Sequence, residues 1–194
     1  MHEEWRREKR STMVVALSVG HVGRIDKDLR DYGCSAGNAI EGELAHEYSL
    51  EAAKLLRAAG HRVFIQSFGE YADRIEFAHS ARADVYVSCH VNSAESEGDY
   101  GLVLYDGNVE NADALAIHLA SSLEAQKRRV HDAASYGNWR NAYNCISLCY
   151  YRRPFGIVYE PFFIQQYVSA PEKYSPKIIG AQLATGLLNY WGSR

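Results

Sequence analysis

The sequence lacks several features that mark particular classes of protein. Its 194 residues include only four cysteines, at positions 34, 89, 145 and 149. They are too few and too scattered for the disulfide framework of a small secreted domain. The apolar run at 13–19 is too short for a membrane span and lacks the cleavage site of a secretion signal. We therefore expect synthesis in a reducing cytoplasm, without an export signal.

An excess of charge of one sign is also lacking. The chain has 21 basic and 24 acidic residues, a formal net charge of −3, and neither sign is concentrated in one half. A protein that binds nucleic acid or an anionic membrane usually carries a basic surface. The composition therefore offers no electrostatic case for nucleic acid as a partner, or for stable membrane association.

The apolar residues that are present follow two periodicities. Hydrophobic residues make up 47% of the chain, enough for one core. Short β-branched runs at 13–19, 61–67, 83–89, 101–105 and 156–160 predict strands, and helical spacing predicts helices near 44–59, 73–82, 109–126 and 175–191. This alternation predicts one α/β domain: a mainly parallel twisted sheet of about six strands, with helices on both faces. Irregular stretches are expected at 20–40 and 130–155.

Metal-binding and acidic side chains stand at three predicted strand ends. The first strand runs into His21, the third into His90, and the last into Glu160. In open α/β sheets, functional residues gather at the carboxyl ends of the strands. Two imidazoles and one carboxylate, with a fourth position left to water, form a common catalytic zinc shell. The carboxylate ligand is expected at the start of the first helix, which offers Glu41, Glu43, Glu47 and Glu51.

Taken singly, these residues have ordinary explanations. A lone histidine at a strand end is most often a hydrogen-bonded structural residue, and acidic residues in a first helical turn often only complement the helix dipole. Glu160 is harder to explain in this way, because it lies within the apolar segment VYEPFF. Burying a carboxylate there is costly unless it is paired.

Five segments together resemble a known family. They are VALSVGHVG (15–23), LLRAAGHRV (55–63), ADVYVSCHVNS (83–93), GLVLY (101–105) and IVYEPFF (157–163). In this order, and with an acidic helix start after the first segment, they resemble the zinc-dependent N-acetylmuramoyl-L-alanine amidases of autolysins and phage endolysins. The resemblance covers roughly residues 13 to 190. It implies a charged N-terminal extension at 1–12 and a zinc amidase catalytic domain at 13–194.

The resemblance also implies roles for individual residues. His21 and His90 correspond to the zinc histidines, Glu160 to the catalytic glutamate, and Arg74 to an arginine of the helix before the second histidine. Glu41 is the preferred carboxylate ligand, because counting back from the glycine that ends the helix favours it. Helix phase agrees, since Glu41 shares a face with apolar residues three, seven, eleven and fourteen positions later. Glu43 is the second choice; Glu47 stays an alternative, although it would leave the helix short by more than a turn.

With Glu41 assigned as the ligand, the sequence still departs from the family pattern at two places. Ala45 stands where the family usually has asparagine, and the loop GRIDKDLRDYG replaces a glycine-rich one.

The implied reaction is hydrolysis of the amide between the lactyl group of N-acetylmuramic acid and L-alanine in peptidoglycan. We expect a monomer that acts on the cell wall after release, as a phage endolysin or, second, a bacterial remodelling enzyme. The alternatives are a zinc peptidase acting within the stem peptide and a non-catalytic wall-binding module. Expected groove contacts are Tyr136, Trp139, Arg140, Tyr143, Arg152 and Arg153.

Overall fold

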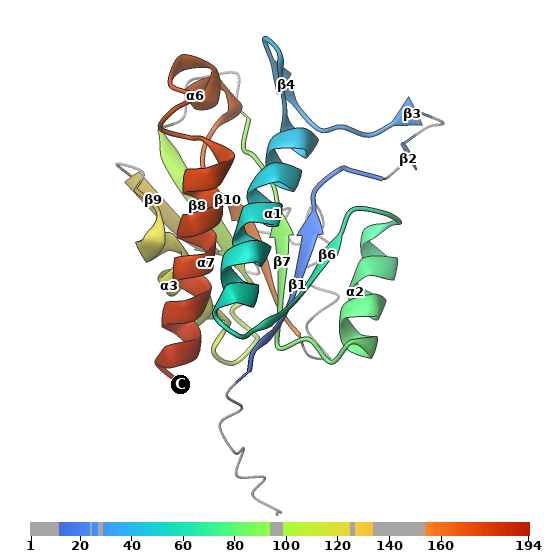
Figure 1. The fold of residues 1–194 in the computed structure, drawn as a ribbon, viewed down its shortest axis with the longest axis vertical. Coiled ribbons are helices and arrows are strands. Elements are labelled where there is room, and N and C mark those ends of the chain that lie inside the picture. Colours follow the sequence, from blue (N-terminus) through green and yellow to red (C-terminus); the bar gives the residue numbers. More distant parts are fainter. Residues whose placement is uncertain (1–11, 24, 27–28, 94–98, 125–126, 134–153) are drawn as a thin grey trace, which may run out of the picture.

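A six-stranded sheet forms the centre of the protein in the computed structural model, which describes residues 12–23, 25–26, 29–93, 99–124, 127–133 and 154–194 (Figure 1). The strand order is β6-β1-β7-β10-β8-β9. The strands are β1 (Val14–Val19), β6 (Arg62–Gln66), β7 (Val85–Cys89), β8 (Tyr100–Tyr105), β9 (Lys127–Asp132) and β10 (Phe155–Glu160). The predicted α/β class with a sheet of about six strands is confirmed.

Four neighbouring strands of the sheet run in the same direction. β1 pairs in parallel with β6 and β7, and β7 pairs in parallel with β10. β8 is antiparallel to β10 and parallel to β9. The carboxyl ends of β6, β1, β7 and β10 therefore meet at one edge of the sheet. This edge carries the side chains that the sequence singles out.

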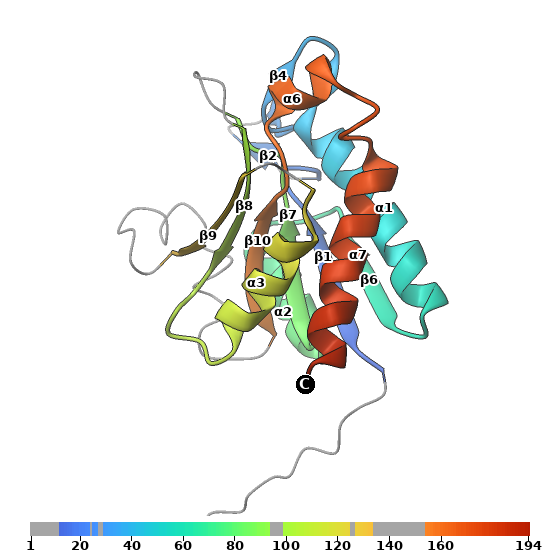
Figure 2. The ribbon, with the colours of Figure 1, turned by 90° about the vertical axis from the view of Figure 1, so that its left-hand side faces the viewer.

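Helices cover both faces of the sheet, as predicted (Figure 2). α1 (Glu41–Ala58), α3 (Ala112–Ser122) and α7 (Pro176–Gly192) pack on one face, and α2 (Tyr71–Ser80) packs on the other. Alternation along β1 serves both layers: Val15 and Leu17 join the larger core, while Val14 and Ala16 join the core beneath α2. A short helix, α6 (Ile164–Ser169), follows β10.

The structure differs from the sequence prediction in the connecting segments. The helix expected at 109–126 ends at Ser122, and the following edge strand β9 was not predicted. Its sequence KRRVHD lacks the apolar alternation of the other strands; a charged edge strand discourages pairing with other chains. The segment 20–40, expected to be irregular, contains the short pairs β2 (Ile25–Asp26) with β3 (Leu29–Arg30) and β4 (Ser35–Ala36) with β5 (Ala39–Ile40).

Several predictions fall outside the described residues. They concern most of the charged extension at 1–12 and all six expected groove residues, which lie between 134 and 153. Within the described part of the chain, no helix combines the length and apolar character needed to cross a membrane.

Candidate metal and catalytic site

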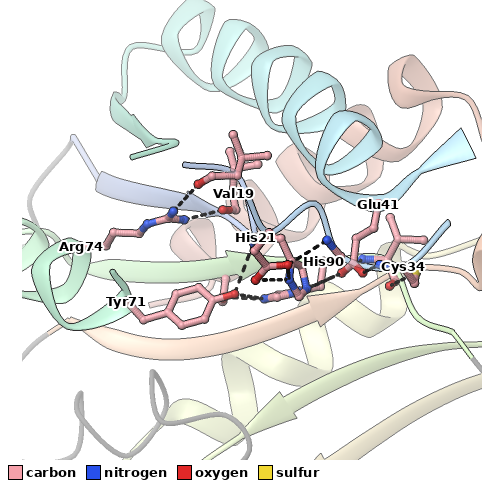
Figure 3. Close-up of polar contacts among 12 residues, drawn as sticks. Val19, His21, Cys34, Glu41, Tyr71, Arg74 and His90 are labelled. Atoms are coloured by element: carbon pink, nitrogen blue, oxygen red, sulfur yellow. Dashed lines mark hydrogen bonds and ion pairs between the residues drawn. The ribbon is translucent and has the colours of Figure 1, made fainter. Parts of the chain in front are cut away.

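Two histidines meet at the carboxyl edge of the sheet (Figure 3). β1 leads into Gly20 and His21, and β7 leads into His90; the two strand ends are joined by the Gly20 N–H, which donates to the Cys89 carbonyl at 2.8 Å. The rings of His21 and His90 pack edge to face with their centroids 5.0 Å apart. Parallel pairing of β1 with β7 thus brings together imidazoles that are 69 positions apart in the chain.

Glu41 lies between the two imidazoles. Its Oε1 is 3.3 Å from His21 Nε2 and 3.0 Å from His90 Nδ1. One potential ligand atom from each of the three residues lies within 4.8 Å of the others. In the described part of the chain, these residues form the one group of three or more His, Cys, Asp or Glu that could hold a metal ion.

This donor set fits zinc. Zinc accepts imidazole nitrogen and carboxylate oxygen at about 2.0–2.2 Å in tetrahedral geometry, which separates neighbouring ligand atoms by about 3.3–3.6 Å. The separations of 3.0 and 3.3 Å between the Glu41 oxygen and the imidazole nitrogens are close to this value. Three protein ligands also leave the fourth position open, as catalytic zinc sites do.

The start of α1 directs Glu41 into the site. Glu41 is the first residue of the helix and only 5% exposed, whereas Glu43 and Glu47 are exposed. The residues three and seven positions after Glu41, Leu44 and Tyr48, are buried in the core. Burial raises the pKa of Glu41, but hydrogen bonds and charge interactions with the two histidines outweigh it and hold the pKa well below its ordinary value. Glu41 is therefore an anion, the form that binds a metal.

His90 is fixed on both sides of its ring. Its Nδ1 contacts Glu41, while its Nε2 lies 3.1 Å from Ser88 Oγ and 3.4 Å from the Tyr71 hydroxyl. Its ring also packs directly over Gly20, where a methyl group would lie 2.6 Å from His90 Cε1 and Nδ1. Glycine at position 20 is therefore required for the ring to occupy this place.

His21 adopts a backbone conformation that few non-glycine residues use. Its φ is 64°, in the left-handed region, where a residue other than glycine is strained. Its backbone N–H donates to the Tyr71 hydroxyl at 3.4 Å, and its Nδ1 lies 2.8 Å from Asp31 Oδ1. Burial lowers the pKa of His21, but the Glu41 and Asp31 carboxylates together raise it above its ordinary value.

Arg74 of α2 supports the turn that carries His21 (Figure 3). Arg74 is 1% exposed, and its guanidinium donates to the carbonyls of Val19 and Val22, on either side of His21. It also donates to the Gly69 carbonyl at 2.9 Å. Arg74 therefore holds the end of β1 and the loop before α2 together from beneath the site.

Glu160 ends β10 beside His90. Tyr159 pairs with Cys89 in the parallel register, and the His90 N–H donates to the Tyr159 carbonyl at 2.9 Å. Tyr159 and Cys89 both point into the larger core, so alternation places Glu160 and His90 on the opposite side of the sheet. Glu160 is only 4% exposed. The strand end that carries the buried Glu160 thus lies next to the strand end that carries His90.

The fold and sequence were compared with known proteins. The family model described as N-acetylmuramoyl-L-alanine amidase matches residues 15–167, well over half of the chain. The chain belongs to this family. A search of curated proteins finds no match.

Solved structures of several amidases share the fold. The amidase AmiC2 of Nostoc punctiforme aligns with a TM-score of 0.71 at 19% identity, over 94% of this chain and 98% of its own. The catalytic domain of CwlV, an amidase of Bacillus (Paenibacillus) polymyxa var. colistinus, aligns with a TM-score of 0.72 at 16% identity, over 94% and 100%. The catalytic domain of the CD27L endolysin, which targets Clostridia difficile, aligns with a TM-score of 0.68 at 20% identity, over 91% and 97%.

The structure of this amidase brings together the three residues expected to bind metal, and the end of β10, which carries Glu160, lies next to the strand end that carries His90. Glu43 and Glu47 lie on the exposed side of α1 and outside the cluster. Sequence reasoning missed Asp31 and Tyr71, which contact the two histidines. The departure of the loop GRIDKDLRDYG from the family pattern was the one signal that could have pointed to Asp31.

Proposed function

We propose that this amidase is zinc-dependent and hydrolyses the amide between the lactyl group of N-acetylmuramic acid and L-alanine in peptidoglycan. The family match supports the reaction. The observation that carries the zinc dependence is the convergence of His21 Nε2, Glu41 Oε1 and His90 Nδ1 at one point. His21, Glu41 and His90 would hold the ion.

A bound zinc ion supplies a Lewis acid and lowers the pKa of water towards neutrality. The chain's own residues supply the proton transfers. In this proposal the Glu160 carboxylate accepts a proton from the attacking water and later delivers it to the nitrogen of the leaving L-alanine. One carboxylate can serve as general base and then as general acid in successive steps, since the first step leaves it protonated.

The surroundings of Glu160 suit this role. Pairing continues beyond β10, because the Asn92 N–H donates to the Phe162 carbonyl and the Ile164 N–H donates to the Asn92 carbonyl, each at 2.9 Å. Phe163 is buried and packs edge to face against Tyr100, with ring centroids 4.9 Å apart. The backbone on both sides of Glu160 is thus fixed, which keeps the carboxylate oriented and limits access of bulk water.

The decisive experiment is digestion of peptidoglycan of known composition by the purified protein. Mass spectrometry of the products should reveal a new amino terminus at L-alanine, and a chelator should abolish this product until zinc is restored. A new amino terminus at another residue would instead identify a peptidase that cuts within the stem peptide. No product together with no bound zinc would identify a wall-binding module.

Glu160→Gln tests the proton-transfer role separately. We expect hydrolysis to fall by about 10²–10⁴-fold, the usual contribution of a positioned general base, while zinc content stays unchanged. Glu172→Gln is the matched control, because Glu172 is exposed and lies outside the site. Equal activity of Glu160→Gln and Glu172→Gln would remove Glu160 from the mechanism.

The biological setting is a finer part of the proposal: a monomeric phage endolysin without stable membrane association, made in the cytoplasm and reaching the wall after release. Production in a bacterial cytoplasm tests it. We expect lysis when a membrane-permeabilising protein is produced alongside, and none without it. A bacterial remodelling enzyme that is exported by its host would lyse or modify the wall without such help.

A further inference from the structure

A four-residue turn, residues 31–34, contacts two of the three residues of the metal cluster. Asp31 Oδ1 and Oδ2 lie 2.8 and 2.9 Å from His21 Nδ1. Both carboxylate oxygens therefore face the ring nitrogen that points away from Glu41. A carboxylate accepts hydrogen bonds, so this contact places a proton on Nδ1 and leaves the lone pair on Nε2.

The Asp31 carboxylate is itself held by the turn. Its Oδ1 accepts a hydrogen bond from the Gly33 N–H at 3.0 Å, which closes a tight turn. Gly33 has a φ of +75°, and a methyl group on it would lie 2.5 Å from Glu41 Oε2 and 2.8 Å from His21 Cδ2. The backbone of the turn thus packs directly against both side chains, at a distance that only glycine permits.

The last residue of the turn orients Glu41. The Cys34 N–H donates to Glu41 Oε2 at 3.0 Å, and the Glu41 N–H donates to the Cys34 carbonyl at 2.9 Å. The Gly42 N–H donates to the Tyr32 carbonyl at 3.1 Å. The turn therefore fixes the first residues of α1, and it engages Oε2 so that Oε1 faces the two imidazoles.

We propose that the turn 31–34 is a positioning element that selects the coordinating atoms, with Asp31 presenting His21 Nε2 and the Cys34 backbone presenting Glu41 Oε1. This inference rests on the zinc site of the proposed function. Asp31 does not touch the metal position; it acts through His21. Partners of this kind orient a ligand and typically contribute 10–100-fold to metal affinity.

Zinc affinity, measured by competition with a chromogenic chelator, tests the role of Asp31. We expect Asp31→Ala to weaken zinc binding by about 10–100-fold and Asp31→Asn to weaken it less, because the amide oxygen can still accept the Nδ1 proton. Asp99→Ala is the control. This substitution also removes an ion pair, between Asp99 and Lys127 at 2.8 Å, but Asp99 lies away from the cluster. Zinc binding by Asp31→Ala as tight as that of Asp99→Ala would overturn the proposal.

Imidazole ¹⁵N chemical shifts of the metal-free protein at mildly alkaline pH give a readout that does not depend on zinc. We expect His21 to carry its proton on Nδ1 in the wild type, and Asp31→Ala to shift the population towards the Nε2–H tautomer. An unchanged tautomer in Asp31→Ala would also overturn the proposal. Failure of the wild type to bind zinc would instead defeat the proposed function, so the two failures are distinguishable.

Cys34→Ala tests the backbone part of the inference. The Cys34 thiol is half-buried near the Val91 carbonyl, 3.9 Å away, whereas its N–H contacts Glu41. Because alanine keeps the N–H, we expect zinc affinity within about twofold of the wild type. Loss of a residue that binds the metal directly costs far more than the 10–100-fold lost with a residue that only hydrogen-bonds to a ligand. A large loss of affinity in Cys34→Ala would assign the effect to the thiol and overturn the role of the backbone.

Discussion

Replacing Gly20 with alanine should disrupt the metal site without replacing any proposed ligand. A methyl group on Gly20 would lie 2.6 Å from Cε1 and Nδ1 of His90 and 2.8 Å from the Cys89 carbonyl. Gly20 is absent from the glycines with positive φ, so backbone strain is not expected to contribute. The effect of Gly20→Ala therefore comes from contact with His90 and its strand.

The size of the displacement follows from these distances. Ordinary contacts of a methyl carbon begin near 3.4 Å, so the His90 ring must move by about 0.8 Å. Ligand distances in a metal site are fixed to within about 0.2 Å. The Cys89 carbonyl cannot relieve the clash, because it accepts the Gly20 N–H that joins β1 to β7. We expect zinc affinity to fall by at least about 10–100-fold, the loss that follows removal of a residue hydrogen-bonded to a metal ligand. We expect the free energy of unfolding to fall by about 1–3 kcal/mol.

Two measurements on the purified protein check this expectation. Chelator competition gives the zinc dissociation constant, and urea unfolding of the metal-free protein gives its stability. Gly192→Ala is the matched control, because a methyl group there meets no atom within 4 Å. If Gly20→Ala binds zinc as tightly as Gly192→Ala, then His90 does not hold the metal from the position seen here, and the reasoning is refuted.

Four further expectations concern other parts of the site. Glu41→Ala should lose bound zinc, whereas Glu43→Ala, which removes an exposed carboxylate two positions away, should retain it. Elemental analysis distinguishes the two variants, and full retention in Glu41→Ala would show that another carboxylate binds the ion. Zinc binding should release a proton near neutral pH, because the pKa of His21 is raised and zinc binds the neutral imidazole; calorimetry in buffers of different ionisation enthalpy measures this, and the release should diminish as the pH rises through that pKa. The same raised pKa stabilises the metal-free fold at pH values below the ordinary histidine pKa. This contribution should be lost as the pH rises through the pKa that His21 has in the folded protein. Arg74→Met should cost about 2–5 kcal/mol in unfolding free energy, because it removes the donor to the buried Val19 carbonyl and to the partly buried carbonyls of Val22 and Gly69. A loss no larger than that of Arg128→Met, which replaces an exposed arginine on β9, would contradict this role.

Helix phase was the sequence signal that singled out Glu41 from its neighbours. Leu44, Tyr48 and Ala52 are buried in the core, as the phase required, whereas Leu50, which would share a face with Glu43, is 48% exposed. A helix has one buried side, so the apolar stripe determines which acidic residue of the first turn faces the sheet edge. The five predicted strands were found for a similar reason, because their alternating apolar residues must fill cores on both faces.

The elements that the sequence did not reveal depend on contacts between distant residues. β9 is a strand because β8 offers it a partner, and its own residues are mostly charged. Asp31 lies in a polar loop among other charged residues, and nothing local distinguishes it from them. Its contact with His21 exists because the loop folds back over the end of β1.

The sequence by itself therefore determined the class of fold, the strand ends that bear His21, His90 and Glu160, and the face of α1 that bears Glu41, since each follows from the periodicity of nearby residues. Only the tertiary structure decided which atoms of these side chains meet and which neighbours orient them. The physical reason is that hydrogen bonds to His21, His90 and Glu41 join segments far apart in the chain, and their distances are set by the packing of the whole sheet edge.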